Sequence, residues 1–277
     1  MSVSIVFALA NQVQHIALRH MNVRIGTIVN VSTTFILLLS MAPFYFDPAW
    51  LGNPALAWFA LSGLIVPALS MTLHTWSIRL LEPAIAAALT STSPVFSILV
   101  ASTFLQESGG WHLYTGTAII IGGIAFIALR SRRMRATWPL WALAIPLGAA
   151  LSRGITHNLV KFGLADLPSP VTAALVGSGV SCLLLTTRQA FARQAMPRDR
   201  AGYGLFAVCG LLNAVGLVGL NLALGMGTVS RVAPLIATTP AFTLLLGRFF
   251  FRNAAIGWPT IAAMAVIFAG CLLIILH

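Results

Sequence analysis

Apolar runs about as long as a membrane helix alternate with short polar links along the whole chain. A helix needs roughly 17–25 apolar residues to cross the hydrocarbon core of a bilayer. Ten runs qualify, near residues 3–19, 25–45, 55–78, 84–105, 112–130, 138–160, 171–187, 202–224, 230–251 and 256–276. Because backbone groups in lipid must find hydrogen bonds within their own segment, each run predicts a helix. The predicted fold class is an all-α integral membrane protein with ten transmembrane helices.

Two stretches half a chain apart repeat each other. At an offset of 146 residues, identical residues coincide: Leu89, Thr92, Pro94, Phe96, Leu99 and Phe104 fall on Leu235, Thr238, Pro240, Phe242, Leu245 and Phe250. At an offset of 142, His15 falls on His157, and Asn11 and Gln14 fall on Arg153 and Thr156. Five helices per copy is an odd number, so the second copy enters the bilayer upside down. The prediction is two inverted five-helix repeats, 1–135 and 136–277, that form one transport unit.

Composition favours lipid as the surrounding solvent. Hydrophobic residues make up 58% of the chain and charged residues 8%, with a mean hydropathy of +0.94. An ordinary soluble domain carries about 25% charge. The net charge of +11 does not indicate nucleic acid, because the arginines lie in links between apolar runs, where anionic lipid is the expected partner. The three cysteines show no paired spacing, so neither a disulfide frame, a metal site nor a cofactor is predicted. Residues 1–20 lack the basic start and cleavage site of a signal peptide.

The basic residues are distributed unequally between the two sides of the predicted bundle. Thirteen arginines lie in the links after the odd-numbered runs, and the other side holds only Lys161 and Arg231. The positive-inside rule therefore places the odd-numbered links in the cytoplasm and both termini outside. The expected location is the inner membrane of a bacterial cell.

Arg153 is the outstanding polar residue within a run. Its guanidinium stays ionised and offers a fork that matches a carboxylate or phosphate. One interpretation is an anchor for an anionic group of a substrate. The alternatives are a structural hub bonded to backbone carbonyls, or an arginine that reaches the interface. Thr156 and His157 share its helical face, and Asn11, Gln14 and His15 form the equivalent face in the first copy. The two histidines are candidates for proton transfer, and packing residues are the alternative.

Further candidates for a substrate pathway are polar or aromatic residues in the third and eighth runs: His74, Trp76, Asn213 and Asn221. Trp76 also fits an interfacial aromatic anchor, and the asparagines also fit close helix packing. Pro94 and Pro240, each preceded by hydroxyl residues, predict helix kinks that serve either gating or packing.

Acidic residues and enzyme motifs constrain the function. No run contains an acid, which disfavours the transport of cations through a buried carboxylate. Glu107 follows the fourth run and is expected to have a structural or gating role. The chain has no zinc-protease, nucleophile-elbow or Walker motif, so neither an enzyme nor an ATP-driven pump is predicted.

The fourth run carries a resemblance to a known family. Pro94 followed by Phe104-Leu105-Gln106-Glu107 is similar to the end of the fourth helix in the EamA branch of the drug/metabolite transporter superfamily. The second copy has Asn253 in place of the acid, and Asn11-Gln12 stands where the family often has Trp-Gly. The resemblance covers nearly the whole chain. It implies ten helices, metabolite export, and both termini in the cytoplasm, opposite to the charge distribution.

The expected function is secondary transport, by alternating access, of a small anionic or zwitterionic metabolite such as an amino acid or related carboxylate. The cavity is expected between the repeats, and the protein to be a monomer or homodimer. The alternatives are transport of a phosphorylated or lipid-linked sugar, or a membrane scaffold or sensor that transports nothing.

Overall fold

The computed structural model describes residues 1–70, 73, 76–77, 89–90, 92–107, 110–130, 140–192, 199–249 and 258–276. Throughout these residues the secondary structure is helical and contains no β-strand. The chain divides into two compact units. Unit 1 comprises Met1–Leu64 and Leu159–Met226, and unit 2 comprises Ile65–Asn158 and Gly227–His277.

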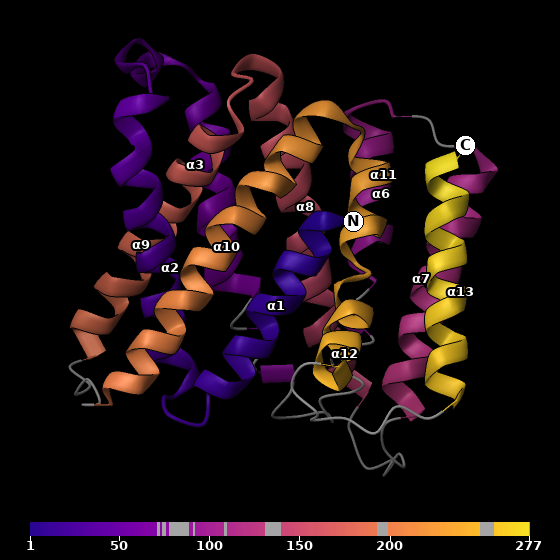
Figure 1. The fold of residues 1–277 in the computed structure, drawn as a ribbon. Coiled ribbons are helices and arrows are strands. Elements are labelled where there is room, and N and C mark those ends of the chain that lie inside the picture. The colour runs from indigo at the N-terminus through magenta and orange to yellow at the C-terminus, as the bar shows by residue number, and fades with distance from the viewer. Residues whose placement is uncertain are drawn as a thin grey trace. The chain divides into compact units, whose positions relative to one another are not determined.

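Unit 1 is built around two long helices, α9 and α10. Its elements are α1 (Ser2–Ala17), α2 (Val23–Met41), η1 (Ala42–Phe44), η2 (Pro48–Gly52), α3 (Ala55–Gly63), α9 (Pro170–Ala192) and α10 (Arg200–Met226). Helix α10 packs against α1, α2 and α9, and α9 also packs against α2 and α3 (Figure 1). The core where α2 meets α10 contains Ile25, Ile28 and Phe206.

Unit 2 contains a pair of helices packed along their length, α7 and α13. Its elements are η3 (Leu64–Leu69, which starts at the unit boundary), α6 (Ser93–Phe104), α7 (Trp111–Arg130), η4 (Leu140–Leu143), α11 (Val229–Ile236), α12 (Thr239–Phe249) and α13 (Trp258–Leu276). Figure 1 shows α7 and α13 side by side, and their shared core includes Ile120, Ile124 and Ile267. Helix α11 packs against α6. Helix α8 (Ala144–Asp166) begins in unit 2 and ends in unit 1 without interruption.

Several helices have the length and composition of membrane spans. Among the described residues, four segments have enough apolar residues to cross a bilayer: Val23–Phe44, Pro170–Ala192, Arg200–Met226 and Val229–Gly247. Shorter apolar helices are Ala55–Val66, Ser93–Phe104, Trp111–Phe126 and Ala265–Leu276. The all-helical fold expected from the sequence is therefore observed, whereas the ten-helix count and the repeats stay predictions.

Three of the predicted runs, 55–78, 84–105 and 230–251, are interrupted in the structure. In the run 55–78, Val66 has extended dihedral angles, φ −121° and ψ 128°. A residue that precedes a proline in the sequence is disfavoured from helical geometry. The run 230–251 is two helices, α11 and α12, separated at Ala237 and Thr238. Hydropathy alone does not reveal such breaks, because the apolar character of a run does not depend on its backbone conformation.

The run 84–105 is interrupted at Thr92, two residues before Pro94. This break has the same local structure as the break before Pro240. The Thr92 hydroxyl donates to the carbonyl of Leu89 at 2.6 Å, and the Thr238 hydroxyl donates to that of Leu235 at 2.6 Å. Each hydroxyl donates to a carbonyl that, in a continuous helix, would accept the N–H group of the residue four positions later. Each proline then lies in the first turn of the next helix, where its missing N–H is not needed. Residues 146 positions apart thus adopt matching turns.

Glycine permits a very close backbone approach in unit 1. A Cβ atom added to Gly63 of α3 would lie 2.2 Å from the carbonyl oxygen of Gly177 on α9. The Ser181 hydroxyl bonds the Gly63 carbonyl at 2.7 Å in the same region. Small residues and hydroxyls are the usual means by which membrane helices associate.

Candidate functional site

A polar cluster lies in unit 2, where α8 meets the start of the segment that follows the break at Val66. The half-buried Arg153 donates its Nε–H to the Ser70 hydroxyl at 3.3 Å. Ser70 is fully buried, and its own hydroxyl donates to the carbonyl of Ala149 at 3.3 Å. Ser70 thus holds the arginine through Nε. Over the described residues, Ser70 is the one hydrogen-bond partner recorded for the Arg153 side chain.

The same face of α8 carries a second polar group, which contacts α6. Nδ1 of His157 lies 3.3 Å from the Ser97 hydroxyl. The side-chain amide of Asn158 donates to the carbonyls of Ser97, at 3.2 Å, and Gly154, at 2.9 Å. Gly154 makes this contact possible, because a Cβ atom there would lie 2.8 Å from Cβ of Phe96. The helices therefore approach closely at one glycine and exchange hydrogen bonds beside it.

This arrangement places a cation beside neutral hydrogen-bonding groups. With Nε engaged by Ser70, the guanidinium retains its two terminal nitrogens, which can bind both oxygens of a carboxylate. His157 and Ser97 add hydrogen-bonding groups from α8 and α6. No group of three or more metal-ligating side chains occurs in the described part of the chain. The cluster has the chemistry of an anion or zwitterion site.

Two members of the cluster were missed by the sequence interpretation, Ser97 and Asn158. Asn158 is 1% exposed, and its Oδ1 has no hydrogen-bond partner among the described residues. Serine and asparagine are frequent packing residues in membrane helices, so neither stood out as a single polar residue. The sequence did hold a signal for Asn158, because it extends the group of polar residues Arg153, Thr156 and His157 within one apolar run.

The predicted first-copy residues lie on α1, in unit 1. Asn11 and His15 are exposed, and Gln14 is half-buried. Asn213 on α10 donates from its side-chain amide to Oδ1 of Asn30 on α2 at 3.1 Å. Asn221, 2% exposed, donates to the carbonyl of Pro170 at 3.2 Å. Both asparagines therefore link helices within unit 1.

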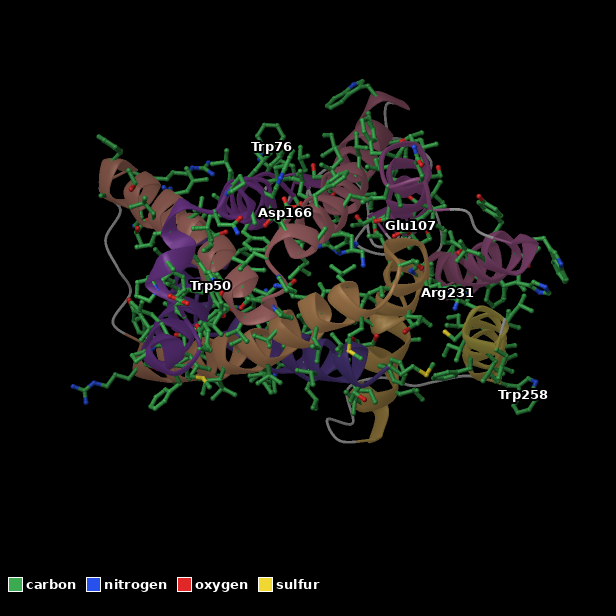
Figure 2. The ribbon with its side chains drawn as sticks, turned by 90° about the horizontal axis from the view of Figure 1, so that it is seen from above. Trp50, Trp76, Glu107, Asp166, Arg231 and Trp258 are labelled. Atoms are coloured by element: carbon green, nitrogen blue, oxygen red, sulfur yellow. The ribbon has the colours of Figure 1, made fainter. Side chains whose placement is uncertain are left out.

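The remaining candidates lie in or beside unit 2. The Thr156 hydroxyl bonds the Ser152 carbonyl of its own helix at 2.9 Å. Trp76 is 57% exposed and lies at the periphery in the view from above (Figure 2). His74 lies outside the described residues. Pro94 is buried at the start of α6, and Pro240 follows the first residue of α12.

Glu107 caps a neighbouring helix. Its Oε1 accepts the backbone N–H of Val229 at 3.0 Å, and its Oε2 accepts the N–H of Ser230 at 3.0 Å and the Ser230 hydroxyl at 2.7 Å. A carboxylate at a helix N-terminus satisfies free amides and complements the helix dipole. Figure 2 shows Glu107 beside the first turn of α11, where Arg231 is labelled. The expected structural role of this residue thus has a definite partner, α11.

The turn that presents Glu107 contains an unusual backbone conformation. Gln106 has a positive φ of 54°. The N–H groups of Leu105 and Glu107 both bond the carbonyl of Ala101, at 2.9 and 3.2 Å, which closes the end of α6. A left-handed conformation costs a residue with a Cβ atom roughly 1–2 kcal/mol, so glycine usually occupies this position. The turn aims the carboxylate at α11 despite that cost.

A family model and one curated relative both indicate membrane transport. The EamA-like transporter family matches residues 1–129 and 139–276. A protein of Streptantibioticus cattleyicolor, named "Probable terminal-alkyne amino-acid exporter", is 30% identical over 140 residues, which are 50% of this chain and 43% of that protein. The match thus spans less than half of that relative. A solved structure titled "Crystal structure of protein" aligns with a TM-score of 0.81 and 13% identity over 99% of this chain and 95% of its own. This last likeness concerns the fold alone.

Proposed function

This chain is a member of the EamA-like transporter family and a multi-pass integral membrane protein, and on that premise we propose that it exports an amino acid or a related small carboxylate. In this proposal the substrate moves by alternating access, driven by a gradient of its own or of a coupled ion. Arg153 binds the substrate carboxylate, and the neutral groups around it bind the rest of the polar head.

The geometry of Arg153 carries the proposal. Nε is held by Ser70, and among the described residues no partner bonds the terminal nitrogens, which suits them to a ligand. An ionised group inside a membrane protein is costly, so such residues usually line a substrate path or pair with a partner. A zwitterion fits this site better than a cation, because the positive guanidinium repels a second positive charge.

The name of the Streptantibioticus cattleyicolor relative supports an amino acid as the substrate class. An amino acid combines a carboxylate, which suits Arg153, with an ammonium group that needs hydrogen-bond acceptors. The buried Oδ1 of Asn158 and the Ser97 hydroxyl, in the same cluster, are acceptors of that kind.

We also propose the ten-helix architecture with inverted repeats 1–135 and 136–277. Two separate stretches match the same family, at residues 1–129 and 139–276, which is compatible with a duplication. The matching turns at Thr92 and Thr238 add support at atomic detail. In this architecture Pro94 and Pro240 are equivalent positions and candidates for gating.

For orientation in a bacterial inner membrane, we propose that the arginine-rich links face the cytoplasm and both termini face outward. Thirteen basic residues against two give this assignment. Fusions of alkaline phosphatase or green fluorescent protein to His277 test it. The phosphatase is expected to be active and the fluorescent protein dark, and the opposite pattern would reverse the orientation.

The substrate class is tested by ligand-induced thermal stabilisation of the purified protein in detergent. The panel contains L-amino acids, the terminal-alkyne amino acid propargylglycine, sugar phosphates and organic cations. We expect amino acids to raise the melting temperature, because a ligand that binds only the folded state stabilises it. Stabilisation by sugar phosphates or cations alone would reject the proposed class. Counterflow of the best amino acid in proteoliposomes then tests transport, and binding without counterflow would favour a sensor.

Variants of α8 test the anchor. Arg153→Ala is expected to remove most of the stabilisation by amino acids, whereas Arg153→Lys keeps the charge and retains a larger part of it. Ser152→Ala is a matched control, because the Ser152 hydroxyl bonds the Gly148 carbonyl of its own helix, at 2.8 Å. If Arg153→Ala kept full affinity, Arg153 would not be the anchor.

A further inference from the structure

The short helix α11 is held at its first turn by an acidic side chain from another element. Glu107 follows α6, and its two carboxylate oxygens accept three hydrogen bonds from Val229 and Ser230. The donors are two backbone N–H groups and one hydroxyl, and together they fix the position of the carboxylate. This contact joins the end of α6 to the start of α11.

Helix α11 has a break in the helical backbone on each side, so it is a separate segment between α10 and α12 in the chain. Before it, Gly227 and Thr228 form a non-helical link after α10. After it, the chain leaves the helix at Ala237 and Thr238, and α12 begins at Thr239. The helix is only 8 residues long and contains Pro234. Movement of such a segment requires changes in a few dihedral angles at its ends and no unwinding within it.

The end of α6 is shaped to deliver the carboxylate. Gln106 adopts the left-handed conformation with φ 54°, and the N–H of Glu107 bonds back to the carbonyl of Ala101 at 3.2 Å. A turn that holds a residue with a side chain in this conformation is typical of a functional constraint. The constraint here serves the contact with α11.

We propose that Glu107 is a positioning residue of the transport cycle, which holds α11 against α6 in the state described here and must release it before the cycle can proceed. The inference rests on the proposed transport function. It goes beyond that function by assigning the contact that opens and the segment that moves. The carboxylate does not touch the substrate and acts through the position of α11.

Hydrogen exchange tests the contact without any substrate. In Glu107→Gln, the amide keeps one oxygen but presents N–H groups to a second donor, so the first turn of α11 loses part of its cap. We expect exchange at the amides of Val229 and Ser230 to rise about tenfold, with exchange in α7 and α13 and the melting temperature unchanged. Gln106→Gly is the matched control, because it retains the carboxylate and adopts the same left-handed turn without steric cost, so exchange at Val229 and Ser230 should not change. Unchanged exchange in Glu107→Gln, or an equal rise throughout unit 2, would overturn the proposal.

Reversible cross-linking tests the release. Glu107→Cys and Ser230→Cys, in a chain whose three native cysteines are replaced, are bridged by a short bifunctional methanethiosulfonate. Counterflow of the amino acid chosen above is expected to fall about tenfold and to recover with reductant. The control is Ser32→Cys in a chain that keeps Cys182 and lacks the other two native cysteines, because the Ser32 hydroxyl lies 3.3 Å from the Cys182 sulfur between α2 and α9. Full counterflow in the bridged 107/230 chain, or equal inhibition in the control, would overturn the proposal.

The two tests separate the failure of this inference from the failure of the proposed substrate. If no amino acid is transported, the substrate class fails, and the exchange experiment still decides whether Glu107 controls the first turn of α11. If transport occurs and bridging leaves it unchanged, the proposed substrate class is supported, and the proposed release of α11 from Glu107 is wrong.

Discussion

Ser70 holds Arg153 through Nε at 3.3 Å while its own hydroxyl proton goes to the carbonyl of Ala149. The Ser70 hydroxyl therefore accepts from Arg153 and donates to Ala149, and both of these residues lie on α8. In the proposed site, Ser70 orients the guanidinium through Nε for binding of a carboxylate by the two terminal nitrogens.

Ser70→Ala is expected to weaken the binding of an amino acid by about 3- to 10-fold, less than Arg153→Ala, because the charge remains and only its orientation is lost. The double variant is expected to bind no worse than Arg153→Ala alone, since both changes act on one interaction. Thermal stabilisation by graded ligand concentrations measures all three. Additive losses would show that Ser70 contacts the ligand independently.

Gly63→Ala is expected to lower the stability of unit 1 by about 1–3 kcal/mol, because the new methyl group would press into the Gly177 carbonyl, 2.2 Å away. Gly177→Ala offers a matched comparison. A Cβ atom at Gly177 would meet the Ser62 hydroxyl oxygen at 3.5 Å, an ordinary contact. Melting temperatures of the two variants in detergent check the difference, and equal values would contradict the close approach of α3 and α9.

Asn213→Ala is expected to lower stability by about 0.6 kcal/mol, the average for a side-chain hydrogen bond between membrane helices, because it breaks the bond to Asn30. Asn30→Ala should cost about the same, and the double variant should cost little more. A loss of ligand affinity at unchanged stability would instead place Asn213 on the substrate pathway.

Asp199 makes one contribution to stability dependent on pH. Hydrogen bonds from the N–H of Gly202, then from His20 and Ala201, hold the pKa of this carboxyl below its ordinary value of 3.8. A carboxyl with a depressed pKa stabilises the folded state above pH 3.8, and the stabilisation is lost as pH falls through the lower folded-state pKa. Because the group is exposed, salt screens its pairing with His20 at 3.1 Å. Melting temperatures from pH 7 to pH 2 should fall less in Asp199→Asn than in the unmodified chain.

Hydrophobic pattern predicted the class of this fold and most helix positions, because the length of an apolar run is set by the bilayer itself. It did not predict the break at Val66, since proline is compatible with a hydrophobic run. The division between α11 and α12 lies just before Pro240, where proline and hydroxyl residues, and not hydrophobicity, predicted a kink. Arg153 was found from its sequence because a charge within an apolar run is rare. Its partner Ser70 and the residues Ser97 and Asn158 required coordinates, because hydrogen bonds between distant helices leave no periodic signal.

Helix α8 supplies residues to both compact units without a break between Asn158 and Leu159. Neither unit can lose its part of this helix without fraying the other, because helix formation is cooperative along a continuous segment. The consequence is thermodynamic linkage. A substitution that destabilises one unit should therefore also destabilise the other. We expect thermal unfolding to show a single transition even where the substitution lies in only one unit.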